Sequence, residues 1–127
     1  MARKNKTTLK NFLLLQEFEK FCLDKGFTIQ KEVLYKDLFD TDRNYRADYL
    51  LIRNNYRCMV EINGGQYSGG RHNNSATNIS ASKKLNTKIT NYENDLMKLN
   101  LAQANGIFVF QFTYEMLFKQ IYKQYFS

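Results

Sequence analysis

The sequence predicts a mixed α/β fold in which helices cover both faces of one mixed central sheet. Three observations predict it: an opening segment with helical apolar spacing, two apolar runs that flank Asn54-Asn55, and a short apolar run between two later helical patterns. The expected order is helix, three strands, helix, strand, helix. This order is typical of a three-layer α/β/α sandwich.

The first predicted helix spans Leu9–Lys25 and ends at Gly26, a residue that often terminates helices. A strand follows at Thr28–Tyr35. The apolar positions of the helix recur at helical spacing: Leu9, Phe12, Leu15, Phe18 and Cys22.

A β-hairpin is predicted next, with strands Tyr45–Arg53 and Tyr56–Asn63. Asparagine tolerates the left-handed conformations that a two-residue hairpin turn requires, so Asn54-Asn55 is the expected turn. Counting back from it places Asp48 opposite Glu61, and the alternation of the strand returns Asn63 to the same face. Because both strands are apolar on both faces, we expect them to be central and covered by helices.

The second half of the chain contains one more strand and two more helices. Residues 64–72 are rich in turn-forming residues, and residues 73–88 are polar and basic, typical of a mobile loop. The remaining expected elements are a helix from the capping box at Thr90–Glu93 to Gly106, a strand buried on both faces at Ile107–Phe112, and an aromatic amphipathic helix at Tyr114–Phe126.

Length and composition indicate one domain over residues 1–127, with a basic N-terminal arm over residues 1–8. No apolar run approaches the roughly 20 residues that span a bilayer, and the first apolar segment contains too many charges for a signal peptide. Cys22 and Cys58 lie in segments expected to be buried, and their spacing is not that of a zinc cluster. These features favour a cytoplasmic protein without a membrane partner.

Asp48 and Glu61 carry the strongest indication of function. Two carboxylates held side by side on a stiff sheet repel each other unless a proton or a cation lies between them. Oxygen ligands of this kind suit Mg²⁺ or Mn²⁺. The alternative is a structural ion pair of one acid with Arg46 or Arg71, which we consider the weaker hypothesis because burying two acids for structure alone is costly.

The net charge of +7 and the pI of about 9.4 favour an anionic partner, and nucleic acid before membrane. A solvated basic surface without a ligand would give the same charge. A hard cation near basic loops indicates phosphate chemistry, because the metal polarises a phosphoryl oxygen and activates a water molecule. The combination suggests hydrolysis of a nucleic-acid backbone.

The ordered motifs resemble the PD-(D/E)XK nuclease superfamily, and most closely its small phage-borne and very-short-patch-repair-like members. The resemblance covers roughly residues 29–117. It implies a restriction-endonuclease-like core and a DNA endonuclease of a phage or its bacterial host. It rests on five features in order: Arg46-Ala-Asp-Tyr49, Val60-Glu-Ile-Asn-Gly-Gly65, Ser68-Gly-Gly-Arg-His72, Asp95, and Asn105-Gly-Ile-Phe-Val-Phe-Gln-Phe112.

The resemblance implies that Asp48 is the principal metal ligand and Glu61 the second carboxylate. Asn63 occupies the position of the superfamily's lysine, and an amide cannot carry a positive charge. Lys98 could supply that charge, or it is a surface lysine. Glu17 or Glu19 of the first helix could complete the metal site, or each is a solvated helix residue.

The remaining candidates concern the substrate. His72 could act as a general acid or base or contact phosphate, and a loop histidine without a role is an equal alternative. Asp95 is either a third acidic contributor or favourable charge in the first turn of a helix. The residues expected to contact the DNA backbone are basic: Arg71, Lys83, Lys84 and Lys88.

The sequence therefore predicts a Mg²⁺-dependent DNA endonuclease. Resolution of branched DNA such as a Holliday junction is the leading hypothesis, because an aromatic C-terminal helix could pair two copies on one junction; nicking of mismatched DNA is the next. The alternative is a nucleic-acid-binding module with weak catalysis that keeps the nuclease fold.

Overall fold

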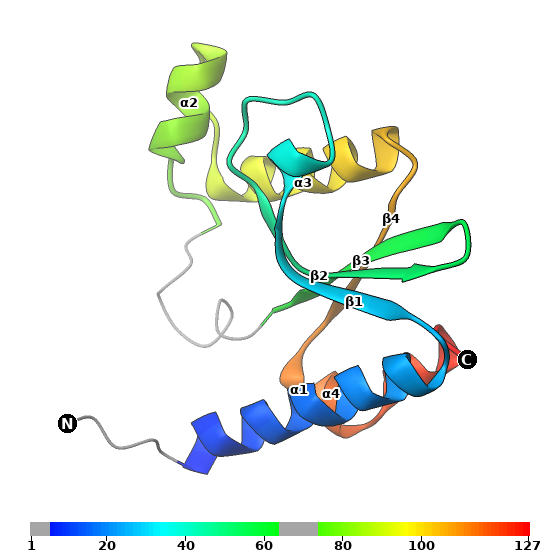
Figure 1. Cartoon of the computed structure of the whole chain (residues 1–127). Coiled ribbons are helices and arrows are strands. Elements are labelled where there is room, and N and C mark those ends of the chain that lie inside the picture. The colour runs from blue at the N-terminus through cyan, green and yellow to red at the C-terminus, as the bar shows by residue number, and fades with distance from the viewer. Residues whose placement is uncertain (1–5, 64–73) are drawn as a thin grey trace, which may run out of the picture. The chain divides into compact units, whose positions relative to one another are not determined.

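The computed structural model describes residues 6–63 and 74–127, and within them the side chains from residue 8 onward. The protein is a mixed α/β protein with a four-stranded mixed sheet and the element order α-β-β-β-α-α-β-α (Figure 1). Its elements are α1 (Lys6–Asp24), β1 (Thr28–Leu34), β2 (Arg46–Arg53), β3 (Tyr56–Ile62), α2 (Ile79–Leu85), α3 (Asn91–Ala104), β4 (Phe108–Phe112) and α4 (Tyr114–Phe118), with short 3-10 helices at Tyr35–Asp37 and Ile121–Gln124.

The chain forms two compact units. The first combines the described residues up to Asn63 with Phe110–Ser127, and the second consists of the described residues from Asn74 to Val109. The first unit contains α1, the β1–β2–β3 strands and α4, and the second contains α2 and α3. The single domain expected from the sequence stays a prediction, because two compact units can belong to one domain.

The sheet has the strand order β1-β2-β3-β4, so β2 and β3 are its central strands. The register of β2 with β3 runs from Arg53↔Tyr56 to Tyr49↔Val60, which confirms the predicted hairpin. Asn54 has a φ of +56°, the left-handed conformation that asparagine tolerates. The turn residues therefore set the register on which the candidate site depends.

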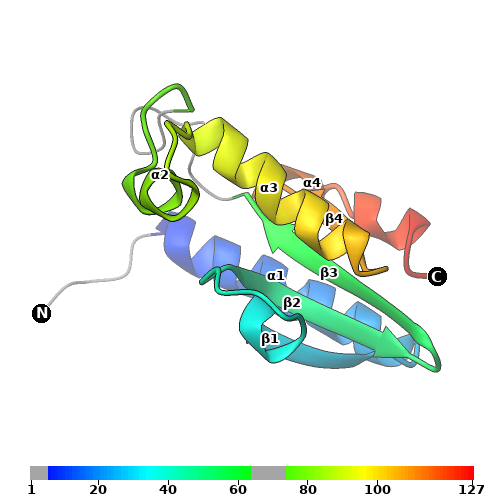
Figure 2. The ribbon, with the colours of Figure 1, turned by 90° about the horizontal axis from the view of Figure 1, so that it is seen from above.

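The core of the first unit lies between the sheet and the two helices α1 and α4. In Figure 1 these helices lie together on one side of the strands, and Figure 2 shows α1 extending along β1, β2 and β3. Leu50 and Met59 project from the other face of β2 and β3 and are at most 1% exposed, so the central strands are buried on both faces as expected. The core cluster consists of Phe18, Cys22, Phe27, Tyr49, Leu51, Cys58, Val60, Phe112, Leu117, Tyr122 and Phe126.

Two glycines end helices as the sequence predicts. After α1, Gly26 has a φ of +90°, its N–H donates to Leu23 O at 3.0 Å, and Phe27 N–H donates to Cys22 O at 3.1 Å. After α3, Gly106 has a φ of +78°. The paired bonds after α1 form the glycine-terminated motif that satisfies the last carbonyls of a helix. The Thr90–Glu93 capping box at the start of α3 is also confirmed.

Three predicted elements differ from the structure. The segment 73–88, expected to be a loop, contains the helix α2. The strand β4, expected to be buried on both faces, lies at the edge of the sheet, and Phe108 in it is 58% exposed. The C-terminal helix expected at Tyr114–Phe126 is interrupted after α4 at Gln120, whose φ is +58°. Within that segment Tyr122 and Phe126 are core residues.

Both cysteines are fully buried in the core of the first unit. Burial, followed by the neighbouring Cys58 and Glu19, raises the pKa of Cys22 from 9.0 to about 12. Burial also raises the pKa of Cys58 to about 11, against a smaller lowering by Tyr56 and Arg53. Each thiol is therefore held in its protonated form by the folded state.

We expect the free energy of unfolding to fall as pH rises from about 9 towards 12. The unfolded thiol of Cys22 loses its proton first, so the folded state binds more protons in this range and stability is lost with rising pH. Urea unfolding at a series of alkaline pH values measures this loss. The Cys22→Ala variant should be less stable than wild type at every pH, but its free energy of unfolding should decline less steeply above pH 9. An unchanged slope would contradict this account.

Candidate functional site

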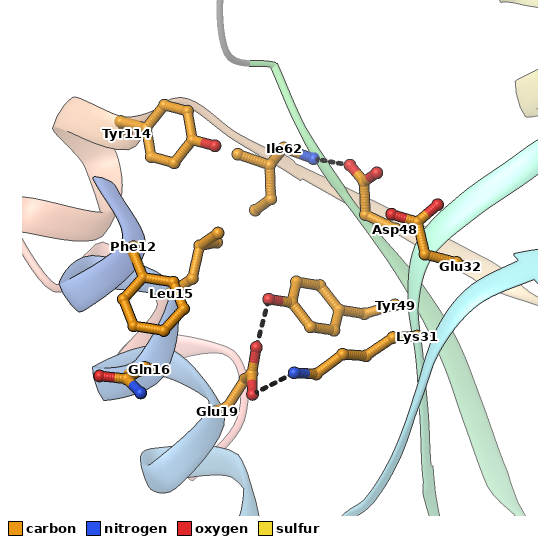
Figure 3. A pocket seen from close by; sticks show the side chains of 10 residues that line it. All are labelled: Phe12, Leu15, Gln16, Glu19, Lys31, Glu32, Asp48, Tyr49, Ile62 and Tyr114. Carbon is orange, nitrogen blue, oxygen red and sulfur yellow. Dashed lines mark hydrogen bonds and ion pairs between the residues drawn. The ribbon is translucent and has the colours of Figure 1, made fainter. Parts of the chain in front are cut away.

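Asp48 lies on β2 in the first unit and contributes to the wall of a pocket of about 400 Å³ (Figure 3). Its Oδ2 accepts a hydrogen bond from the backbone N–H of Ile62 at 2.7 Å. This bond fixes the carboxylate against the end of β3, where the ladder of β2 with β3 has already ended at Tyr49↔Val60. The predicted principal ligand therefore has a defined position at the rim of a pocket.

Glu61 occupies β3 one position beyond Val60. The ladder of β2 with β3 ends at Tyr49↔Val60; continued by one position, its register would bring Asp48 opposite Glu61, so their opposition stays a prediction. The Oε1 atom of Glu61 is buried. Burial first, and then the charge of Glu61 and the neighbouring Tyr45, raise the pKa of Tyr35. Glu61 therefore lies close enough to Tyr35 to disfavour the ionised form of that phenol.

Asn63 connects the end of β3 to β4. Its N–H donates to Phe112 O at 2.8 Å, and its side-chain Nδ2 donates to Gln111 Oε1 at 3.0 Å. The amide thus has a structural partner in the first unit.

The pocket is lined by both apolar and acidic side chains. Lys31 supplies a positive charge among the described residues that line it. The complete lining is Phe12, Leu15, Gln16, Glu19, Lys31, Glu32, Asp48, Tyr49, Ile62 and Tyr114, all of them in the first unit. A mixed wall of this kind is typical of a pocket that orients a small group by a few polar contacts.

Glu19 is held by two neighbours inside this pocket (Figure 3). Tyr49 Oη donates to Glu19 Oε2 at 2.6 Å, and Lys31 Nζ lies 2.9 Å from Glu19 Oε1. Burial raises the pKa of Tyr49, and the hydrogen bond to Glu19 raises it further. The phenol therefore stays a donor, and Glu19 holds Lys31 at the pocket.

The two first-helix acids that the sequence left open have different positions. Glu19 lines the pocket together with Asp48. Glu17 instead accepts a hydrogen bond from Gln120 Nε2 at 2.6 Å and is exposed. Of the two, Glu19 is the one that the structure brings to Asp48, although each of its oxygens already has a partner.

Of the ten residues that line this pocket, the sequence singled out Asp48 and Glu19 as site residues and missed the other eight. Glu32 has a φ of +55°, between the Lys31↔Tyr49 and Val33↔Ala47 pairs, and its Oε2 lies 3.4 Å from Arg46 Nη1. Arg46, which the sequence offered as an ion-pair partner for Asp48 or Glu61, pairs with Glu32 instead. The charged Lys31-Glu32 dipeptide within a predicted strand was the available signal, since β1 places it next to Asp48.

The other predicted residues lie in the second unit or outside the described residues. Lys83 and Lys84 belong to the last turn of α2, Lys88 follows that helix, and Lys98 lies in α3 with Asp95. Arg71 and His72 lie outside the described residues, as does most of the basic arm.

Within residues 6–63 and 74–127, no group of three or more His, Cys, Asp or Glu side chains is arranged to hold a metal ion. In the same part of the chain, no helix combines the length and apolarity that crossing a membrane requires. Comparison of the chain with models of protein families, with curated proteins and with solved structures finds no match.

Proposed function

We propose that this protein is a Mg²⁺-dependent DNA endonuclease in which Asp48 and Glu61 hold the metal. The observation that carries the proposal is the position of Asp48 at the rim of a pocket. The register of β2 with β3, continued one position past Tyr49↔Val60, would bring Glu61 opposite Asp48, although Glu61 does not itself line the pocket. Opposed carboxylates on adjacent strands have a physical reason to bind a cation.

The donor set fits a hard cation. Among the described residues, no hydrogen bond occupies Asp48 Oδ1, so this oxygen can act as a ligand while Oδ2 is held by Ile62. Mg²⁺ usually keeps several waters and needs only one or two carboxylates from the protein, with substrate phosphate oxygens completing the shell. Two acids without a third protein ligand are compatible with this ion.

Bound Mg²⁺ would polarise a phosphoryl oxygen and lower the pKa of a bound water. The chain's own contribution is to hold the phosphate near these carboxylates. Lys31, fixed by Glu19, can neutralise phosphate charge at the pocket, and it joins Lys98 as a candidate for the charge that Asn63 lacks. Tyr49 supports this arrangement by donating to Glu19.

We also propose the finer fold and the partner that the sequence suggests: a three-layer sandwich of the PD-(D/E)XK type, acting on DNA in the cytoplasm of a bacterial or phage-infected cell. Two features support this fold: the chain begins with one helix followed by three strands, and the β2–β3 hairpin carries Asp48 and Glu61. Lys83, Lys84 and Lys88 are proposed backbone contacts. Branched DNA, cut by a pair of copies, stays the leading substrate and mismatched DNA the next.

A second candidate function is a DNA-binding module with weak catalysis. The side chain of Asn63 favours it, because this amide holds Gln111 of β4 where the superfamily's lysine would face the metal. Binding by such a module would survive removal of metal and would fall steeply as salt rises.

The test incubates the protein with linear, nicked, mismatched and four-way DNA in Mg²⁺, in Mn²⁺ and in EDTA. An endonuclease cuts at least one of these substrates with either metal and none in EDTA. A protein that binds all four and cuts none with either metal is the binding module, and the nuclease proposal is then wrong.

A further inference from the structure

Three basic side chains meet at the C-terminal end of α1 in the first unit. Lys25 follows the last residue of α1, Arg53 ends β2, and Lys123 belongs to the 3-10 helix Ile121–Gln124. Figure 1 shows the end of α1 near the C-terminal segment that contains this 3-10 helix. Residues far apart in the sequence therefore bring three positive charges to one place in the first unit.

Aromatic rings hold these charges in position. The Nζ atoms of Lys25 and Lys123 each lie 5.6 Å from the ring centroid of Phe21. Arg53 Cζ lies 4.3 Å from the ring centroid of Phe27, and Arg53 Nη1 donates to Lys25 O at 2.9 Å. A cation over an aromatic face is attracted by the charge distribution of the ring. Lys25 and Lys123 are both exposed, so their ammonium groups are accessible to a ligand.

The ring of Phe21 is itself anchored in the core. Its centroid lies 5.4 Å from that of Tyr122, which is 1% exposed. Lys123 comes directly after Tyr122 in the chain, so the residue that anchors Phe21 also positions Lys123. Packed core residues therefore determine where the two lysines lie.

The three cations lack an acidic partner within residues 6–63 and 74–127, where none of them forms an ion pair with a carboxylate. Asp24, the acid next to Lys25 in the sequence, pairs with Lys20 at 3.6 Å. The C-terminal end of α1 attracts cations, but its partial charge of about half an elementary charge does not balance three of them. Because converging like charges repel, the cluster has a physical reason to bind an anion.

We propose that Lys25, Arg53 and Lys123 bind phosphate groups of the DNA backbone. This proposal rests on the proposed function for the identity of the partner, and it adds a contact surface in the first unit to the lysines proposed in the second. None of the three residues lines the pocket beside Asp48, so this contact is separate from the proposed metal site. Phosphate contacts fix the position of the DNA without reading its sequence.

The test measures the affinity for two duplexes of unrelated sequence by fluorescence anisotropy, in EDTA and over a range of salt concentrations. The slope of log affinity against log salt concentration reports the number of phosphates that the protein contacts. Lys25→Gln and Lys123→Gln should each reduce the magnitude of this slope by about 1. Each should weaken binding to both duplexes equally, by roughly three- to tenfold at 0.1 M salt.

Lys36→Gln is the matched control, because Lys36 is an exposed lysine of the first unit in the 3-10 helix Tyr35–Asp37. It removes the same charge at another place and should leave the slope unchanged. Lys25→Arg keeps the charge and should keep the slope as well. Arg53 is not replaced, because its substitution would also break the hydrogen bond to Lys25 O.

Slopes of the two glutamine variants equal to that of wild type would overturn the proposal. An equal loss in Lys36→Gln would overturn it too, since the effect would then follow net charge and not the cluster. Weaker binding of the two variants to anionic phospholipid vesicles, with unchanged DNA slopes, would assign the cluster to a membrane surface instead. Cleavage with Mg²⁺ is measured in parallel: a wild type that cuts no DNA refutes the nuclease, while the slopes still decide the cluster.

Discussion

Replacing Asp48 with asparagine is expected to lower the rate of the proposed Mg²⁺-dependent DNA cleavage by about a thousandfold or more, because the proposed metal site would lose its principal charged ligand. Asparagine keeps an oxygen that can accept the hydrogen bond from Ile62 N–H, so the fold around the pocket is retained. The substitution thus removes charge and little else. Asp48→Ala would also remove the acceptor and leave the Ile62 N–H without it.

The measurement is single-turnover cleavage of the best substrate found for wild type, with DNA affinity measured alongside. Asp24→Asn is the control, because Asp24 is an exposed acid of α1 that pairs with Lys20 on the same helix. It should cleave like wild type. Cleavage by Asp48→Asn within a few-fold of wild type, with affinity preserved, would show that Asp48 holds no catalytic metal.

Replacing Phe18 with alanine is expected to lower the free energy of unfolding by about 3–5 kcal/mol, a large share of the stability of a small protein. Phe18 is fully buried, and its ring centroid lies 5.0 Å from that of Tyr122 and 5.5 Å from that of Tyr49. Truncation leaves a cavity at the point where α1, the sheet and the C-terminal segment meet. Tyr49 also donates to Glu19, so the cavity would loosen the candidate site as well.

Urea unfolding followed by circular dichroism measures this effect. Phe118→Ala is the matched control, because Phe118 is 57% exposed and contacts Lys10 through its ring face. Phe118→Ala should lower the free energy of unfolding by no more than about 1 kcal/mol. Similar losses for the two variants would mean that the aromatic cluster around Phe18 does not organise the core.

The elements that the sequence predicts well are those fixed by local chemistry. The turn at Asn54 and the glycines at 26 and 106 each meet a conformational requirement that few other residues meet, and each stands where the sequence places it. The register of the hairpin, and with it the relation of Asp48 to Glu61, follows by counting from that turn. Local turn and register rules are therefore enough to predict the relative placement of Asp48 and Glu61.

Segment 73–88 shows where composition misleads. Its polar residues were interpreted as loop, yet they form the ends of a helix: the Asn78 side chain accepts from Ala81 N–H at 2.9 Å, and Asn86 ends α2 with a φ of +54°. Ser82 Oγ also accepts from Ile89 N–H at 2.8 Å. Capping side chains and loop side chains have the same composition, and only the hydrogen bonds distinguish them.

The pocket itself could not be predicted, because it depends on contacts between distant segments. Glu19 and Lys31 meet across a helix and a strand, and Tyr114 comes from a third element near the C-terminus. Likewise, β4 was expected to be buried because its residues are apolar, but its place at the edge of the sheet leaves Phe108 exposed. For β4, the position of the strand in the sheet, and not its apolar composition, determines which side chains are exposed.

The left-handed backbone of Glu32 also limits how far the edge of the sheet can pair with another extended chain. β1 is an edge strand, and a long, flat edge offers its backbone N–H and C=O groups to any other extended chain. A φ of +55° in its middle separates Thr28–Lys31 from Val33-Leu34 and interrupts that edge. Two copies meeting edge to edge could pair only over a few residues, so the same residue that lines the pocket helps keep this sheet from growing into an aggregate.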